Sequence, residues 1–210
     1  MKKLLVLLTV FSFAFAATGF AQTTMPSSES VLKQAYAQAG KENKKVMLIF
    51  HASWCGWCKK MEASLNDPTC KKFFDDNYVI ATLDVMEQPA KASLENPGSL
   101  DVLKKFKGEK AGLPFWLILD ANGTLLADSQ VRPAGASLDT PGESVGCPAS
   151  EKEVAYFTGL LKKTSSLNDE QLAVIAKRFA QNKPAPAPVV HSQVDITTPQ
   201  QAPKRRTSDF

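Results

Sequence analysis

The feature that most constrains this chain is the pair Cys55 and Cys58, which lies between a strand pattern and a helix pattern. Residues 46–50 form a short, wholly apolar run, which predicts a strand buried on both faces. After the pair, apolar side chains recur every four residues, as on one face of a helix that begins at about Gly56. These side chains are Trp57, Met61 and Leu65. We therefore expect the two cysteines at the junction of a buried strand and a helix N-terminus.

That position favours redox chemistry at the two sulfur atoms. The unpaired N–H groups and the positive end of the helix dipole stabilise the thiolate of Cys55 relative to its thiol. Cys58 follows one turn later on the same side. Its sulfur can close a small disulfide with Cys55 or attack a mixed disulfide formed there.

Two motifs in this order resemble those of one family. Residues 54–59 read Trp-Cys-Gly-Trp-Cys-Lys, which resembles the active site of thioredoxin-like disulfide oxidoreductases. Residues 112–123 read Gly-Leu-Pro-Phe-Trp-Leu-Ile-Leu-Asp-Ala-Asn-Gly and resemble the strand of that family that follows a cis-proline. Residues 58–62 with Asp67-Pro68 are more similar to exported bacterial members than to small cytosolic thioredoxin. The resemblance covers roughly residues 28–163.

The resemblance implies an α/β thioredoxin fold, in which helices flank a central mixed sheet, here with an extra C-terminal helix. It further implies a cis peptide bond at Leu113-Pro114, packed against the dithiol. By the same resemblance Trp54, Gly56 and Trp57 would position the substrate together with Leu113 and Pro114. The tryptophans could instead be core aromatics.

One departure from the family concerns proton transfer. In thioredoxin proper, the strand before the dithiol carries a buried carboxylate that serves the second cysteine as a base. Six residues before Cys55, this chain has Ile49. Deprotonation of Cys58 would then depend on water, or on His51 or Glu62 if either reaches it.

Residues 1–21 have the pattern of a secretory signal peptide, with two lysines, an apolar region and a cleavage site after Ala21. Cleavage after Ala16 and a single membrane anchor are the alternatives. We expect an exported protein, periplasmic or otherwise extracytoplasmic, with no stable membrane insertion after cleavage. Such a compartment lets a cysteine pair persist as a disulfide. Residues 22–182 are then one thioredoxin-like domain, and residues 183–210 a disordered tail rich in Pro and Ala.

The net charge of +4 gives no reason to expect a nucleic-acid partner. The predicted signal contributes two lysines, and residues 183–210 contribute a net of two positive charges. Residues 22–182 are therefore formally neutral.

Two further cysteines, Cys70 and Cys147, leave several alternatives open. They could form a second disulfide, or Cys147 could be an exposed third thiol in exchange with the active site. Alternatively Cys70 is buried and Cys147 is unrelated to it. A zinc site at the dithiol is disfavoured, because zinc needs four ligands and the only histidines are His51 and His191.

Local signals predict the remaining elements. They predict a helix from Ser27 to about Gly40, a helix opened by Asp67-Pro68, a central strand at 78–85, a hairpin of 114–119 with 124–127, a long loop at 130–149, and capped helices from Ser150 and Asn168.

The sequence thus predicts an exported thiol–disulfide oxidoreductase that exchanges disulfides with protein substrates and needs no cofactor. Resemblance alone favours a reductase, which would need a membrane or soluble redox partner. One alternative is a binding or chaperone module with a static disulfide, and another is a thiol-based metal carrier.

Overall fold

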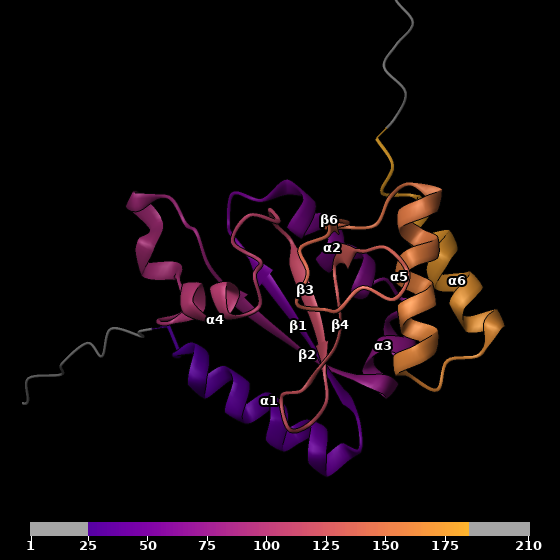
Figure 1. Ribbon diagram of the computed structural model, residues 1–210, viewed down its shortest axis with the longest axis horizontal. Helices are drawn as coiled ribbons and strands as arrows, with labels where there is room; N and C mark the ends of the chain where they lie inside the picture. Colours follow the sequence, from indigo (N-terminus) through magenta and orange to yellow (C-terminus); the bar gives the residue numbers. More distant parts are fainter. Residues whose placement is uncertain (1–24, 185–210) are drawn as a thin grey trace, which may run out of the picture.

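The computed structural model describes residues 25–184 and is built around a mixed four-stranded sheet (Figure 1). The strands lie in the order β2-β1-β3-β4, with β1 and β2 parallel and the other two pairings antiparallel. Their bounds are β1 Lys45–His51, β2 Tyr78–Asp84, β3 Phe115–Leu119 and β4 Leu125–Asp128. The predicted signal peptide, and all but the first two residues of the predicted tail, lie outside the described residues.

Six α-helices and one 3-10 helix surround this sheet within the described residues, and two short strands form a separate hairpin. The bounds are α1 Ser28–Glu42, α2 Gly56–Leu65, α3 Lys71–Asn77, the 3-10 helix η1 Pro89–Leu94, α4 Ser99–Lys105, α5 Glu151–Thr164 and α6 Asp169–Ala180, with β5 Gln130–Val131 and β6 Glu143–Ser144. No helix in residues 25–184 combines the length and the apolar character that crossing a membrane requires.

Alternating side chains of the sheet build two cores, one on each face. Val46, Leu48 and Phe50 of β1 pack with α1 and α4 on one face. Met47 and Ile49 face the other way, toward α2, α3, α5 and α6, which cover the opposite side of the sheet (Figure 1). The continuous apolar run that predicted β1 is explained by this burial on both faces. The predicted thioredoxin-like fold with an extra C-terminal helix is confirmed.

The added helix α6 is part of the second core. α5 and α6 begin where the sequence predicted, after Ser150 and Asn168, and each of these N-caps forms a capping box. Phe179 of α6 lies with its ring centroid 4.8 Å from that of Phe157 in α5. Both side chains are fully buried, so α6 is bound through a large apolar contact.

Three local predictions were wrong in detail. The 78–85 strand is an edge strand, because no described strand pairs with the free side of β2. α1 continues past Gly40 to Glu42, and Asn43 supplies the left-handed residue that ends it. α3 begins at Lys71, because Asp67 caps a preceding turn by accepting hydrogen bonds from Thr69.

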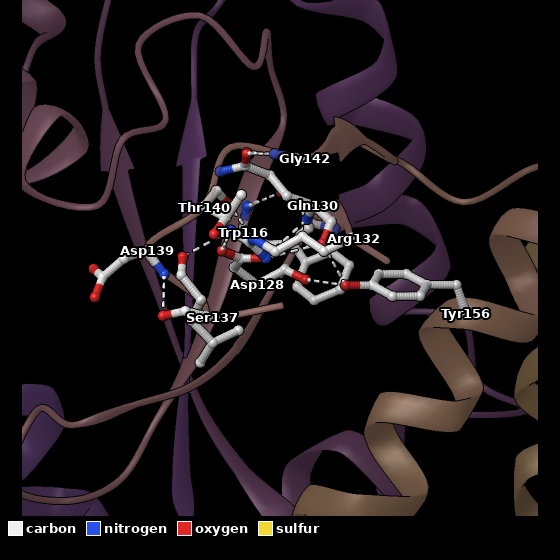
Figure 2. Close-up of polar contacts among 11 residues, drawn as sticks. Trp116, Asp128, Gln130, Arg132, Ser137, Asp139, Thr140, Gly142 and Tyr156 are labelled. Carbon is white, nitrogen blue, oxygen red and sulfur yellow. Dashed lines mark hydrogen bonds and ion pairs between the residues drawn. The ribbon is translucent and has the colours of Figure 1, made fainter. Parts of the chain in front are cut away.

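The 130–149 segment, which was predicted as a loop, contains the β5-β6 hairpin. A buried ion pair between Asp128 and Arg132 holds it against the rest of the domain. The Arg132 guanidinium donates to both oxygens of Asp128 at 2.7 Å, and both side chains are nearly inaccessible. Figure 2 shows this pair with Tyr156 reaching in from α5, where its hydroxyl donates to the Gln130 carbonyl at 2.7 Å. The far end is held by Trp116, whose indole N–H donates to the Gly146 carbonyl at 2.7 Å. The loop therefore has a fixed position against β3.

Candidate active site

The cysteine pair caps α2 and is disulfide-bonded. Cys55 is the N-cap residue, as predicted, and its Sγ accepts a hydrogen bond from the Cys58 N–H at 3.1 Å. The two residues are 4% and 2% exposed, and their Cα atoms lie 5.3 Å apart. The same N–H and the N-terminus of α2 are placed to stabilise negative charge on Cys55 when the pair is reduced.

The Leu113-Pro114 peptide bond is cis, as the sequence resemblance implied. Leu113 is partly buried and packs on the small cluster formed by Ala52, Cys55 and Cys58. Pro114 directly precedes β3, so no ladder hydrogen bond is lost inside the strand. The end of the 130–149 loop passes this turn at Gly146, where an added Cβ would lie 3.6 Å from the Pro114 carbonyl.

The tryptophans beside the pair are on the surface rather than in the core. Trp54 is 50% exposed and Trp57 is 40% exposed. Trp57 shares its four-residue spacing with Met61 and Leu65, but those two side chains are buried whereas that of Trp57 is exposed. The Trp54 indole N–H donates to the Met86 carbonyl at 2.8 Å, and the Lys60 ammonium lies 4.4 Å from the Trp57 ring centroid.

The turn that leads into Cys55 is held by a carboxylate that the sequence reading missed. Glu87 accepts hydrogen bonds from both the backbone N–H and the hydroxyl of Ser53. Although burial opposes ionisation, these two bonds lower the pKa of Glu87 below its ordinary value. No local signal linked these residues, because the contact joins positions that are 34 residues apart in the chain.

A cavity of about 420 Å³ lies on the α2 side of the sheet and reaches Cys58. Ile49, in the position that carries a carboxylate in thioredoxin proper, forms part of its wall and is almost fully buried. His51 and Glu62, the two residues predicted as candidates for proton transfer, also line it. Asp84, which the sequence reading missed, lies beside His51, with Oδ1 2.7 Å from the ring Nδ1.

A second groove, of about 260 Å³, is bounded by the residues that precede Pro114 and by the end of the 130–149 loop. Trp57, Gly112 and Leu113 line it from one side, and Gly146 and Cys147 from the other. The structure therefore brings the predicted Trp57 and Leu113 to one groove.

Cys70 and Cys147 are both free thiols, so the suggested second disulfide is absent. Cys70 is fully buried and donates to the Ser64 carbonyl, while Cys147 lies against the amide of Asn182. Burial raises the pKa of Cys70, and raises that of Cys147 to about 12. The suggestion that Cys147 is an exposed third thiol is also wrong, because it is only 5% exposed.

The described part of the chain, residues 25–184, contains no cluster of three His, Cys, Asp or Glu side chains arranged to hold a metal ion.

Several known proteins are similar to this chain. Residues 28–121, which contain the pair and the cis-proline, match the family model described as thioredoxin-like. Protein disulfide isomerase-like 2-1 of Oryza sativa subsp. japonica is 29% identical over 167 residues, or 77% of this chain and 44% of that protein. Protein disulfide-isomerase A5 of Bos taurus is 34% identical over 82 residues, or 38% of this chain and 16% of that protein. The chain spans less than half the length of these curated relatives.

Two solved structures are also similar to this chain. A disulphide isomerase from Xylella fastidiosa Temecula1 aligns over 64% of this chain and 88% of its own, with 18% identity and a TM-score of 0.45. The C-terminal domain of DsbD from Neisseria meningitidis, in the reduced form, aligns over 50% of this chain and 84% of its own, with 29% identity and a TM-score of 0.37.

Proposed function

We propose that this chain, which carries a thioredoxin-like domain over residues 28–121, is an exported thiol–disulfide oxidoreductase that acts on protein substrates. The observation that carries this proposal is the geometry of the pair. Cys55 caps a helix N-terminus, with Cys58 bonded to it and a cis-proline turn packed against both. The relatives named as protein disulfide isomerases support the same chemistry.

In the reducing direction, the thiolate of Cys55 attacks one sulfur of a substrate disulfide. This forms a mixed disulfide and releases the other substrate sulfur as a thiolate. The thiolate of Cys58 then attacks Cys55 Sγ, so that the Cys55–Cys58 disulfide forms and the second substrate thiolate leaves. Two electrons pass from the dithiol to the substrate, and the reverse sequence oxidises a substrate dithiol.

The surface around the pair fits an extended polypeptide. The backbone before Pro114 borders the groove and is free to pair with a substrate strand. Trp54 and Trp57 present large exposed apolar faces next to the disulfide, which suits apolar side chains flanking the substrate cysteine. Gly56, between Cys55 and Trp57, is exposed and has open space beside it.

Export rests on the signal-like pattern of residues 1–21, and reduction is favoured by family resemblance alone. In an oxidising compartment a reductase would draw its electrons from a membrane or soluble redox partner. The equilibrium reduction potential decides the direction, with the fluorescence of Trp54 and Trp57 as the probe. A value near about −270 mV indicates a reductant, and one near about −120 mV an oxidant.

Two variants test the exchange itself. Cys55→Ser should abolish the reduction of insulin, because the attacking sulfur is lost. Cys58→Ser should retain attack but not resolution, so it should accumulate mixed disulfides with exported proteins. Cys70→Ser is the matched control and should do neither, since its thiol is buried. Insulin reduction that survives Cys55→Ser would contradict the role of Cys55, whereas a wild type that leaves insulin unreduced, with a disulfide that resists mild dithiol, would indicate a binding module with a static disulfide.

A further inference from the structure

Resolution of the mixed disulfide requires that Cys58 lose its proton. A free thiol ordinarily titrates near pH 8.5, so only a few per cent is thiolate at pH 7. Cys58 is 2% exposed, and burial disfavours the charged form of a thiol further. In thioredoxin proper a buried carboxylate takes this proton. Ile49 occupies that position here, and its side chain has no group that could accept a proton. The proton needs another group within reach of the sulfur.

The cavity beside Cys58 supplies a route to such a group. His51 is the last residue of β1, and Asp84 is the last of β2, opposite it in the parallel register. Both line the same cavity as Cys58. A volume of about 420 Å³ holds several water molecules, since each occupies about 30 Å³ in the liquid. A proton can therefore pass from the sulfur to the ring through water.

The contact with Asp84 fixes the chemistry of the ring. When Nδ1–H donates to the carboxylate at 2.7 Å, Nε2 carries the lone pair. No hydrogen bond to Nε2 occurs among residues 25–184, so it is available to accept a proton. The side chains of His51 and Asp84 are 21% and 26% exposed, which leaves their attraction only partly screened. Once protonated, the ring is stabilised by the neighbouring carboxylate.

We propose that His51, oriented by Asp84, is the base that takes the Cys58 proton across this cavity. The proposal rests on the proposed thiol–disulfide exchange and deepens it. The proton passes from Cys58 Sγ through water to Nε2 of His51. The sulfur's electron pair forms the bond to Cys55 Sγ, and the pair of the broken bond leaves on the substrate sulfur. In the reverse reaction the imidazolium returns the proton to Cys58.

Other charged groups face the same space. Glu62 lies on α2 one turn after Cys58, and Lys71 and Asp75 of α3 are the other charged residues that line the cavity besides Asp84. Outside it, Glu87 is close enough for the charge of His51 to lower the pKa of that carboxyl. Glu62 is exposed to solvent, and a hydrated carboxylate is ordinarily a weaker base than imidazole at neutral pH. Lys71 and Asp75 pair with each other at 2.7 Å. Of these groups His51 is the imidazole, and its contact with Asp84 holds the ring in a fixed orientation.

The test uses the full, reduced protein and one equivalent of the aromatic disulfide DTNB in a stopped-flow instrument. Attack by Cys55 releases one thionitrobenzoate, and resolution by Cys58 releases the second. The two phases therefore report the two cysteines separately. Burial raises the pKa of Cys70, and raises that of Cys147 to about 12, so both thiols stay protonated near neutral pH and contribute to neither phase. His51→Gln should slow the second phase at least tenfold at pH 7 and leave the first within about twofold.

The pH profile distinguishes a base from a structural residue. The second phase of the wild type should show an inflection between about pH 5 and 8, the range in which imidazole titrates. His51→Gln should remove this inflection, so that the rate rises with hydroxide until the thiol itself titrates. Asp84→Asn, which keeps the shape and an acceptor oxygen, should slow the second phase about three- to tenfold. Asp75→Asn, a charge removal elsewhere in the cavity, is the matched control and should change it less than twofold.

Each result decides one question. An unchanged second phase in His51→Gln overturns the role of His51, and a larger loss in Glu62→Gln than in His51→Gln assigns it to Glu62 instead. If His51→Gln slows the first phase as well, that variant does not isolate the resolving step, and the Asp84→Asn variant is used instead. An unchanged second phase in Asp84→Asn would then overturn the proposal. Absence of both phases in the wild type would instead contradict the exchange activity, without bearing on the base.

Discussion

The buried pair Asp128–Arg132 gives the sharpest stability prediction. In Arg132→Met the side chain keeps similar length but loses its charge, and the Asp128 carboxylate stays 1% exposed without its partner. Two 2.7 Å bonds to Asp128 disappear, together with guanidinium bonds to the carbonyl groups of Gln130, Leu138 and Thr140 (Figure 2). Only the Gln130 N–H, at 2.9 Å from the carboxylate, remains.

The size of the loss follows from what is left unpaired. Removing one partner of a buried pair costs about 3–5 kcal/mol of unfolding free energy. Leu138 and Thr140 are exposed, so their carbonyl groups regain hydrogen bonds with water. We therefore expect a loss of unfolding free energy at the lower end of that range, about 3 kcal/mol. For a domain of this size that lowers Tm by about 6–12 °C.

Urea unfolding of the oxidised protein, followed by circular dichroism, measures this loss. The double variant Asp128→Asn with Arg132→Met removes the unpaired charge, so it should recover about 1–2 kcal/mol relative to Arg132→Met. A loss below about 1 kcal/mol in the single variant would refute the reasoning. So would a double variant whose loss equals the sum of the two single losses, since the side chains would then be energetically independent.

Three further predictions concern the C-terminal helices. Asn182→Ala removes buried hydrogen bonds, including one of 2.9 Å to the Ser64 hydroxyl, and should cost about 1–3 kcal/mol in urea unfolding. Phe179→Ala should cost about 3–5 kcal/mol of unfolding free energy in the same assay. The control, Val174→Ala on the exposed face of α6, should change the unfolding free energy by less than about 0.5 kcal/mol. Equal losses in the two variants would contradict the apolar contact between α6 and the core. Burial raises the pKa of Glu153, but N–H bonds at the start of α5 outweigh it and lower that pKa below 4.5. The ionised Glu153 therefore stabilises the fold above about pH 4.5, and this stabilisation is lost as the pH falls through the lowered pKa of the folded protein. Glu153→Gln should accordingly make the unfolding free energy depend less steeply on pH in this acid range.

Much of the active site was predictable because its signals are local. The apolar run of β1, the cysteine spacing and the helix start at Gly56 all lie within residues 45–58. Capping at Ser150 and Asn168 likewise depends on residues three positions apart. The local hydrogen bonds of a helix N-terminus form largely independently of distant parts of the chain, and so the sequence alone indicated them.

The tertiary structure decided what depends on register and on burial. Asp84 meets His51 only because β1 and β2 pair in one particular parallel register across 33 residues. Trp57 is exposed while Met61 and Leu65 are buried, although all three have the same four-residue spacing, so burial here was not determined by spacing. Cys70 and Cys147 stay unbonded because each sits in its own packed surroundings. The sequence by itself determined the dithiol and its helix, whereas the group that can take its proton was determined by strand pairing, since that brings distant side chains to one cavity.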